Sequence, residues 1–281
     1  MAGILVGREN TKPIELHYED HGSGPPVVLI HGWPLGSECW EKQIRALLDA
    51  GHRVIAYDRR GFGQSSRAIS GYDYDTLAED LDRLLEVLDL HDAALIGYGM
   101  GAGEVMRYLG TFGSDRVSRA VLVAALPPLL FETDSDPDGP DRSAFNDMRT
   151  ALEDDRPAFL RRFLERACNF DELAGTLVSE DSVRARWIQA IHGSVIGTLE
   201  GLAAWLTDFR DDVRRIDVPM LVIHGDADRV YPLHLIGPPL SEGIPGARLV
   251  VLRGAPHGLL WTHAPQVNAE LIRFLASLAS R

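Results

Sequence analysis

The chain has 281 residues, of which 45% are hydrophobic and 25% charged, enough for one large domain with an inserted segment. This composition excludes disordered, collagen-like and fibrous proteins. The formal net charge of −13 disfavours nucleic acid and anionic membranes as partners, because surfaces that bind phosphates cluster Lys and Arg.

The N-terminal residues, MAGILVGRENTK, contain a short apolar run and no basic leader, which predicts the start of a strand rather than a signal peptide. No run of about 18 apolar residues follows that would span a bilayer. The two cysteines, Cys39 and Cys168, indicate no disulfide framework and fit a reducing compartment. We therefore expect a cytoplasmic protein.

Most of the chain alternates between strand-like and helix-like patterns. Ile14 to Asp20 alternates apolar and polar side chains, which predicts a half-buried antiparallel edge strand. Continuous apolar runs, typical of strands covered on both faces, lie at Val27 to Ile30, His52 to Tyr57, Ala93 to Ile96, Ala120 to Ala125, Met220 to Ile223 and Arg248 to Leu252. Helical patterns lie between them at Trp40 to Leu48, Tyr74 to Leu88 and Gln266 to Leu278. This alternation predicts an α/β fold with a mostly parallel sheet and helices on both faces.

The segment from Pro127 to Arg215 interrupts this alternation. It begins with an acidic loop that contains prolines, Asp134 to Pro140, and continues with helical stretches that lack strand-like runs. We therefore predict a helical lid at residues 127–215, inserted into a core made of residues 1–126 and 216–281.

A glycine-rich segment, Gly97 to Gly101, follows the predicted strand at 93–96 and precedes a helical stretch from Glu104 to Leu109. A nucleophile elbow, Gly-x-Ser-x-Gly, has this strand-to-helix context, and here its central position is Gly99. A dinucleotide-binding loop would need glycine in place of Ala102 and would normally lie nearer the first strand. A plain strand-to-helix turn remains the simpler alternative.

The segment His31-Gly32-Trp33-Pro34 ends a predicted buried strand and starts a loop. Such a loop can place a backbone N–H beside the elbow, so the N–H groups of Trp33 and Met100 are the expected donors of an oxyanion hole. For His31 alone, a structural histidine bonded to nearby backbone is the simpler interpretation.

Two later segments supply an acid and a base. The predicted strand at 220–223 is followed by Asp226 and Asp228, and an acid at this end of a parallel strand can orient a histidine in the site crevice. His257 lies in Gly254-Ala255-Pro256-His257-Gly258, just after the last strand. The chain order elbow, acid, histidine is typical of serine hydrolases built on an open parallel sheet.

On six separated motifs, which span nearly the whole chain, the sequence resembles the cofactor-free bacterial haloperoxidases, or perhydrolases, a branch of the α/β-hydrolases with esterase activity. The motifs are His31-Gly32-Trp33-Pro34-Leu35, Tyr57-Asp58-Arg59-Arg60-Gly61-Phe62-Gly63-Gln64-Ser65, Tyr72-Asp73-Tyr74-Asp75, Thr207-Asp208-Phe209-Arg210, Ile216-Asp217-Val218-Pro219 and Ala255-Pro256-His257-Gly258-Leu259.

The resemblance implies an α/β-hydrolase fold with an eight-stranded sheet, a helical lid and no cofactor. It makes Asp228 the acid and His257 the base of a catalytic triad, and it leaves Asp226 as a structural turn residue. The nucleophilic serine of the family falls on Gly99, where this chain departs from the pattern.

Gly99 has no oxygen or sulfur for a base to deprotonate, so acyl-enzyme chemistry is excluded at this position. Loss of the serine from a triad costs on the order of 10⁶ in turnover. Ser37, Cys39, Ser65 and Ser66 are candidates for a relocated nucleophile, but each lies in a motif whose family counterpart plays no such part.

Three interpretations follow from an otherwise complete site. In the first, His257 acts as a general base, with lyase, cyclase, decarboxylase or cofactor-free oxygenation chemistry. In the second, the chain is an esterase or perhydrolase inactivated by a serine-to-glycine change. In the third, it is a ligand-binding pseudoenzyme without turnover.

The substrate pocket is expected to include His31, Tyr98, Trp205 and Leu259. The other histidines show no metal-ligand spacing, so we expect no metal. The predicted partner is a small apolar organic molecule with a carbonyl or phenol-like group, because a base and an oxyanion hole suit a developing negative oxygen. Assembly of this chain into a homo-oligomer is an open alternative.

Overall fold

The computed structural model describes residues 3–129 and 142–277 and contains a central eight-stranded sheet with the order β1-β2-β4-β3-β5-β6-β7-β8. The strands are β1 Gly3–Glu9, β2 Lys12–His21, β3 Pro26–Ile30, β4 Arg53–Tyr57, β5 Ala93–Tyr98, β6 Val117–Val123, β7 Met220–Gly225 and β8 Arg248–Leu252. β4, β3, β5, β6, β7 and β8 pair in parallel, whereas β1 and β2 form an antiparallel extension. The predicted α/β fold with a mostly parallel sheet is confirmed.

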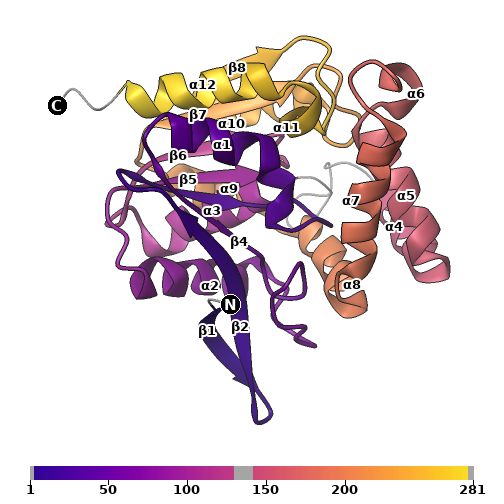
Figure 1. Cartoon of the computed structure of the whole chain (residues 1–281), viewed down its shortest axis with the longest axis horizontal. Coiled ribbons are helices and arrows are strands. Elements are labelled where there is room, and N and C mark those ends of the chain that lie inside the picture. The colour runs from indigo at the N-terminus through magenta and orange to yellow at the C-terminus, as the bar shows by residue number, and fades with distance from the viewer. Residues whose placement is uncertain (1–2, 130–141, 278–281) are drawn as a thin grey trace.

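Helices cover both faces of the sheet, with α1 and α12 on one face and α2 and α3 on the other (Figure 1). The helices are α1 Glu41–Asp49, α2 Tyr74–Val87, α3 Met100–Phe112, α4 Ser143–Asp154, α5 Arg156–Ala167, α6 Phe170–Leu173, α7 Glu180–His192, α8 Val195–Ala203, α9 Arg210–Arg215, α10 Gly237–Gly243, α11 Leu259–Thr262 and α12 Ala264–Ala276. Three short 3₁₀ helices lie at Ser37–Trp40, Ala204–Leu206 and Leu233–Leu235.

The sequence patterns explain these elements. The four residues Val27 to Ile30 of β3 are fully buried, as a continuous apolar run predicts for a strand between two helical layers. Asp73 caps α2 by accepting a hydrogen bond from the Thr76 N–H at 2.9 Å.

Several predicted boundaries differ from the structure. β6 ends at Val123, two residues before the predicted end, because Ala124 turns the backbone into the left-handed region with φ of 43°. The predicted helix from Gln266 to Leu278 begins earlier, at Ala264. Its last residue, Leu278, and the acidic loop from Asp134 to Pro140 lie outside the described residues.

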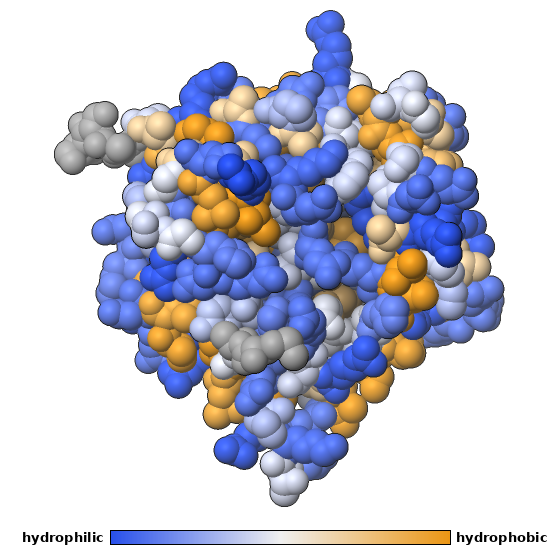
Figure 2. All heavy atoms as spheres, in the orientation of Figure 1, coloured by the Kyte–Doolittle hydropathy of each residue, from blue (hydrophilic) through white to orange (hydrophobic). Residues whose placement is uncertain are grey.

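Helices α4 to α9 follow β6 and precede β7, and in Figure 1 α4, α5, α7 and α8 stand together beside the sheet. We call them the helical segment. Hydrophilic residues dominate the face shown in Figure 2, and apolar residues form small separate groups there. Within residues 3–129 and 142–277, no helix combines the length and the hydropathy that crossing a membrane would require.

A charged cluster lies in the core beneath α3. Glu104, on the first turns of this helix, is fully buried and accepts a hydrogen bond from the Tyr57 hydroxyl. Its second oxygen lies 3.7 Å from the Arg59 guanidinium, which is also buried. Burial raises the pKa of Glu104 to about 7, and the Arg59 charge only partly opposes this effect.

This cluster makes stability depend on pH in a defined direction. Between the ordinary glutamate pKa of 4.5 and about 7, folded Glu104 keeps a proton that the unfolded chain has lost, so its contribution to stability falls as pH rises. Glu104→Gln should therefore gain roughly 1 to 3 kcal/mol relative to the unchanged chain between pH 5 and 7.5, measured by urea unfolding. The exposed Glu79→Gln is the control, and a pH-independent difference for Glu104→Gln would contradict the assignment.

Candidate active site

The turn between β5 and α3 brings strand and helix unusually close. A Cβ atom on Gly97 would collide with the Gly101 carbonyl, and a Cβ atom on Gly101 would collide with the Ile30 carbonyl. Gly99 caps α3 with φ of 53° and ψ of −116°, a conformation that L side chains rarely adopt. The three glycines thus form a sharp elbow at the carboxyl end of β5.

The elbow meets the histidine loop and the loop after β3. A Cβ atom at position 99 would lie 3.4 Å from His257 Nε2 and 3.8 Å from the Gly32 Cα atom. Three segments that are far apart in the sequence therefore converge on one point. A side chain at Gly99 would be in direct contact with the imidazole of His257.

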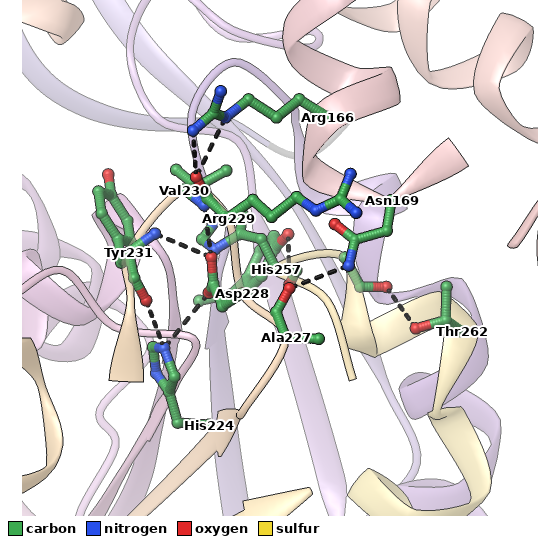
Figure 3. Close-up of polar contacts among 12 residues, drawn as sticks. Arg166, Asn169, His224, Ala227, Asp228, Arg229, Val230, Tyr231, His257 and Thr262 are labelled. Atoms are coloured by element: carbon green, nitrogen blue, oxygen red, sulfur yellow. Dashed lines mark hydrogen bonds and ion pairs between the residues drawn. The ribbon is translucent and has the colours of Figure 1, made fainter. Parts of the chain in front are cut away.

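Asp228 holds the other side of the His257 ring. Its Oδ2 lies 2.9 Å from His257 Nδ1, and both side chains are buried (Figure 3). Its Oδ1 accepts hydrogen bonds from the backbone N–H groups of Val230 and Tyr231, at 2.7 and 2.8 Å. Burial works against ionisation, but the electrostatic interaction with His257 and the hydrogen-bond donors around the carboxylate keep the pKa of Asp228 well below its ordinary value.

A second histidine, His224 on β7, also contacts this carboxylate. Its Nε2 lies 2.8 Å from the Tyr231 carbonyl oxygen and 3.3 Å from Asp228 Oδ2 (Figure 3). Both neighbours are acceptors, so Nε2 carries the proton. Within the described residues the buried Nδ1 has no hydrogen-bond partner. His224 thus donates to the Tyr231 carbonyl and lies beside the Asp228 carboxylate.

The end of α5 is tied to both loops that carry the acid and the base. The Gly258 N–H donates to the Ala167 carbonyl at 2.7 Å. Asn169 Nδ2 donates to the Ala227 carbonyl at 2.9 Å (Figure 3). Arg166 Nη2 donates to the Arg229 carbonyl at 2.9 Å. The helical segment is therefore bonded to the residues next to Asp228 and His257.

An aromatic cluster links the site to the helical segment. The Trp33 ring lies 5.1 Å from Phe163 and 5.5 Å from Trp205, in edge-on geometry, and its Nε1 donates to the Thr198 carbonyl at 3.0 Å. Trp205 in turn lies 5.4 Å from Tyr231, whose ring is 5.1 Å from that of His257. These rings give the surroundings of His257 an apolar wall.

The remaining residues proposed for the pocket lie close to the site in different ways. Tyr98 packs against His257 at 5.2 Å and its hydroxyl donates to the His257 carbonyl at 3.3 Å. Leu259 is buried at the start of α11, two residues after His257. His31 is buried below the loop, where Nε2 accepts from the Arg59 N–H and Nδ1 donates to the Gly32 carbonyl.

Among the described residues, no hydrogen bond joins His257 to any of the four candidates for a relocated nucleophile. Ser65 Oγ donates to the Asp58 carbonyl, and Ser66 Oγ accepts from the Glu15 N–H. The backbone N–H of buried Ser37 donates to Asp58. Burial raises the pKa of the Cys39 thiol to about 12, which disfavours a thiolate.

The sequence did not single out Tyr231 or His224 for this site. Their signal is their position in the sequence. His224 is the last residue but one of β7 and precedes Asp228 by four residues, and Tyr231 follows Asp228 by three. Across residues 3–129 and 142–277, no cluster of three or more His, Cys, Asp or Glu side chains is placed to hold a metal ion.

A family model described as alpha/beta hydrolase fold matches residues 25–264 of the chain. The chain therefore belongs to the α/β-hydrolase family. A Synechocystis protein classed among the non-heme chloroperoxidases is 50% identical over 98% of this chain and 100% of that protein. The non-heme chloroperoxidase CPO-A1 of Kitasatospora aureofaciens is 38% identical over 93% and 96% of the two chains. Within the family, the chain falls in the non-haem haloperoxidase branch.

The solved structures agree with this placement. The bromoperoxidase from Bacillus anthracis superposes with a TM-score of 0.92 at 43% identity, covering 98% of this chain and 99% of that one. The esterase EaEST from Exiguobacterium antarcticum gives a TM-score of 0.89 at 29% identity, covering 99% and 100% of the two chains. The resemblance stated from the motifs is confirmed.

The contacts of Asp228 predict a stability effect with a known pH dependence. Asp228→Asn removes the charge that faces His257 and should cost about 2 to 4 kcal/mol at pH 7 in denaturant unfolding. Because the native pKa is lowered, this contribution is complete above the ordinary value of 3.8 and is lost as pH falls below it. The cost should therefore shrink between pH 5 and pH 3.

Asp226→Asn is the matched control, since exposed Asp226 accepts a single hydrogen bond, from the Gly254 N–H. It should cost less than about 1 kcal/mol. Equal costs for the two variants would show that Asp228 is not the anchor of His257.

Proposed function

We propose that this chain is an enzyme in which His257, oriented by Asp228, acts as a general base directly on its substrate, without an acyl-enzyme. The observation that carries the proposal is the 3.4 Å separation between His257 Nε2 and the place that a Cβ atom of residue 99 would occupy. Because Gly99 has no side chain, a substrate group or a water molecule meets the imidazole there.

The hydrogen bond to Asp228 supports the role of His257 as a base. It occupies Nδ1 and leaves Nε2 as the proton acceptor on the side of the elbow. In the proposed step, Nε2 takes a proton from a carbon next to a carbonyl or from a phenol-like hydroxyl. The electron pair left behind moves onto the substrate oxygen, which becomes negative.

Backbone N–H groups are the proposed partners of that oxygen. Met100 is the first residue of α3, so its N–H has no acceptor within the helix and lies at the positive end of the helix dipole. The Trp33 N–H, in the loop beside Gly99, donates to no protein acceptor among the described residues. Together they form the oxyanion hole of the proposal.

The substrate class follows from the surroundings of His257. Trp33, Trp205 and Phe163 favour a small apolar or aromatic body, and the helical segment is the proposed lid over it. Lyase, cyclase and cofactor-free oxygenation reactions can begin with this proton transfer. A decarboxylation instead releases CO₂, and the electron pair of the broken C–C bond moves onto the same substrate oxygen. Relatives include a bifunctional esterase/perhydrolase of Acinetobacter calcoaceticus, 34% identical over 97% of this chain, but serine-dependent turnover requires the side chain that Gly99 lacks.

Restoring the serine tests the geometry of the elbow. Gly99→Ser should hydrolyse 4-nitrophenyl acetate at least about 10³-fold faster than the unchanged chain, since the new hydroxyl would lie beside His257 Nε2. The left-handed backbone should cost the variant about 1 to 3 kcal/mol of stability. Gly99→Ala carries the same strain without the hydroxyl and should remain inert; an inert Gly99→Ser would contradict the proposed triad geometry.

The base itself is tested by proton exchange, which needs no knowledge of the natural substrate. In D₂O, the unchanged chain should exchange the methyl protons of acetophenone faster than His257→Ala by on the order of 10²-fold, followed by NMR. Gly99→Ala should retain part of the exchange because the base is intact. Equal rates with and without the imidazole would reject general-base catalysis and favour a ligand-binding pseudoenzyme.

A further inference from the structure

The loop that carries Asp228 also fixes a tyrosine at the site. The Tyr231 N–H donates to Asp228 Oδ1 at 2.8 Å, and its carbonyl accepts from His224 Nε2, also at 2.8 Å (Figure 3). The backbone of Tyr231 is thus held by two hydrogen bonds, one to Asp228 and one from His224. The position of its side chain is coupled to that of the His257–Asp228 pair.

The Tyr231 ring lies between His257 and the aromatic cluster. Only 1% of the residue is exposed. The ring stands nearly perpendicular to His257, with an angle of 86° and 5.1 Å between centroids, and edge-on to Trp205 at 5.4 Å. Tyr231 therefore forms part of the immediate surroundings of the proposed base.

The hydroxyl of Tyr231 differs from those of the other buried tyrosines. Tyr57, Tyr72, Tyr74, Tyr98 and Tyr108 each donate a hydrogen bond to a carboxylate or a carbonyl. The Tyr231 hydroxyl makes no hydrogen bond to any described residue. The residue is buried, but its hydroxyl oxygen is not among the fully enclosed polar atoms that lack a partner, so a ligand or water can reach it.

The protonation state of the Tyr231 hydroxyl and its neighbours suit a hydrogen-bond donor. Burial, followed by the nearby groups of Tyr74, Asp228 and Tyr98, raises the pKa of Tyr231 well above its ordinary value, so the hydroxyl keeps its proton. Tyr74 donates to the Met100 carbonyl, and Tyr98 immediately precedes Gly99. Two of the groups that raise the pKa of Tyr231, Tyr74 and Tyr98, therefore belong to the surroundings of the elbow.

We propose that the Tyr231 hydroxyl donates a hydrogen bond to an oxygen of the substrate beside His257, and so supplies the hydroxyl group that Gly99 does not. The inference rests on the proposed function for the location of the substrate. It narrows the substrate class to apolar or aromatic molecules that carry an accepting oxygen, such as a ketone, next to the group that His257 deprotonates. Hydrocarbons of the same shape lack that acceptor and bind less well.

The test compares two probes of nearly equal shape, acetophenone and cumene, by NMR titration of the labelled protein. The unchanged chain should prefer acetophenone, and Tyr231→Phe should reduce the ratio of the two affinities by about threefold to tenfold, the effect of one net hydrogen bond. The affinity for cumene should stay the same in both proteins. Tyr18→Phe, which alters a half-buried tyrosine on β2, should leave both affinities unchanged; the sequence predicted an edge strand here, but β2 lies between β1 and β4.

Stability separates this role from a structural one. Tyr231→Phe should keep the melting temperature of the unchanged chain, since no protein hydrogen bond is lost. Tyr57→Phe should lower it, because the Tyr57 hydroxyl is bonded to buried Glu104. An equal drop in both variants would show that the Tyr231 hydroxyl has a structural partner and would overturn the proposal.

Two binding outcomes also overturn it: an unchanged ratio in Tyr231→Phe, and an unchanged chain that binds acetophenone no better than cumene. These measurements involve no turnover, so they are independent of the exchange assay with His257→Ala. Loss of the ketone preference in Tyr231→Phe, together with unaltered exchange in His257→Ala, would support the donor and reject the base. An unchanged ketone preference in Tyr231→Phe, together with slower exchange in His257→Ala, would support the base and reject the donor.

Discussion

The buried carboxylate of Asp228 is the interaction on which the rest of the site depends. It receives two backbone N–H groups of its own loop and the imidazoles of His257 and His224, so both oxygens are engaged. A buried charge is stable only with such a set of partners. The same contacts fix the orientation of His257, the end of β7 and the placement of Tyr231, so Asp228, His257 and the aromatic rings around them form one connected structure.

The elbow imposes a second constraint. Gly97 and Gly101 permit the close approach of β5, α3 and the end of β3, and no larger side chain fits at either position. The space at Gly99 is of another kind, because a side chain there would meet His257 at ordinary contact distance. The backbone conformation at position 99 is strained for any residue other than glycine. Glycine therefore avoids this strain, but it provides no hydroxyl group beside His257.

The sequence predicted the layers of the fold well because buried parallel strands are continuous apolar runs and the surface helices carry apolar stripes. The proximity of Gly99, Asp228 and His257 also follows from the sequence, since each follows a strand at the same edge of the sheet, whereas their catalytic roles stay a prediction. Boundaries were less accurate, as at Ala124, where a left-handed residue ends β6 inside an apolar run. Tyr231 and His224 were missed because their roles depend on which hydrogen bonds are left unmade or shared, and no local pattern encodes that.

The hydrogen bonds between the end of α5 and the loops that carry Asp228 and His257 limit which parts of the helical segment can vary within this branch of the family. Ala167 and Asn169 contact the backbone beside His257 and Asp228 through carbonyl and amide groups. The proposed lid role leaves α7 and α8 free to vary while this junction stays constant. A chimera that exchanges these helices with those of a relative should have its crossover points outside residues 166–169, because a cut within them separates the bonded groups from the loops that carry Asp228 and His257.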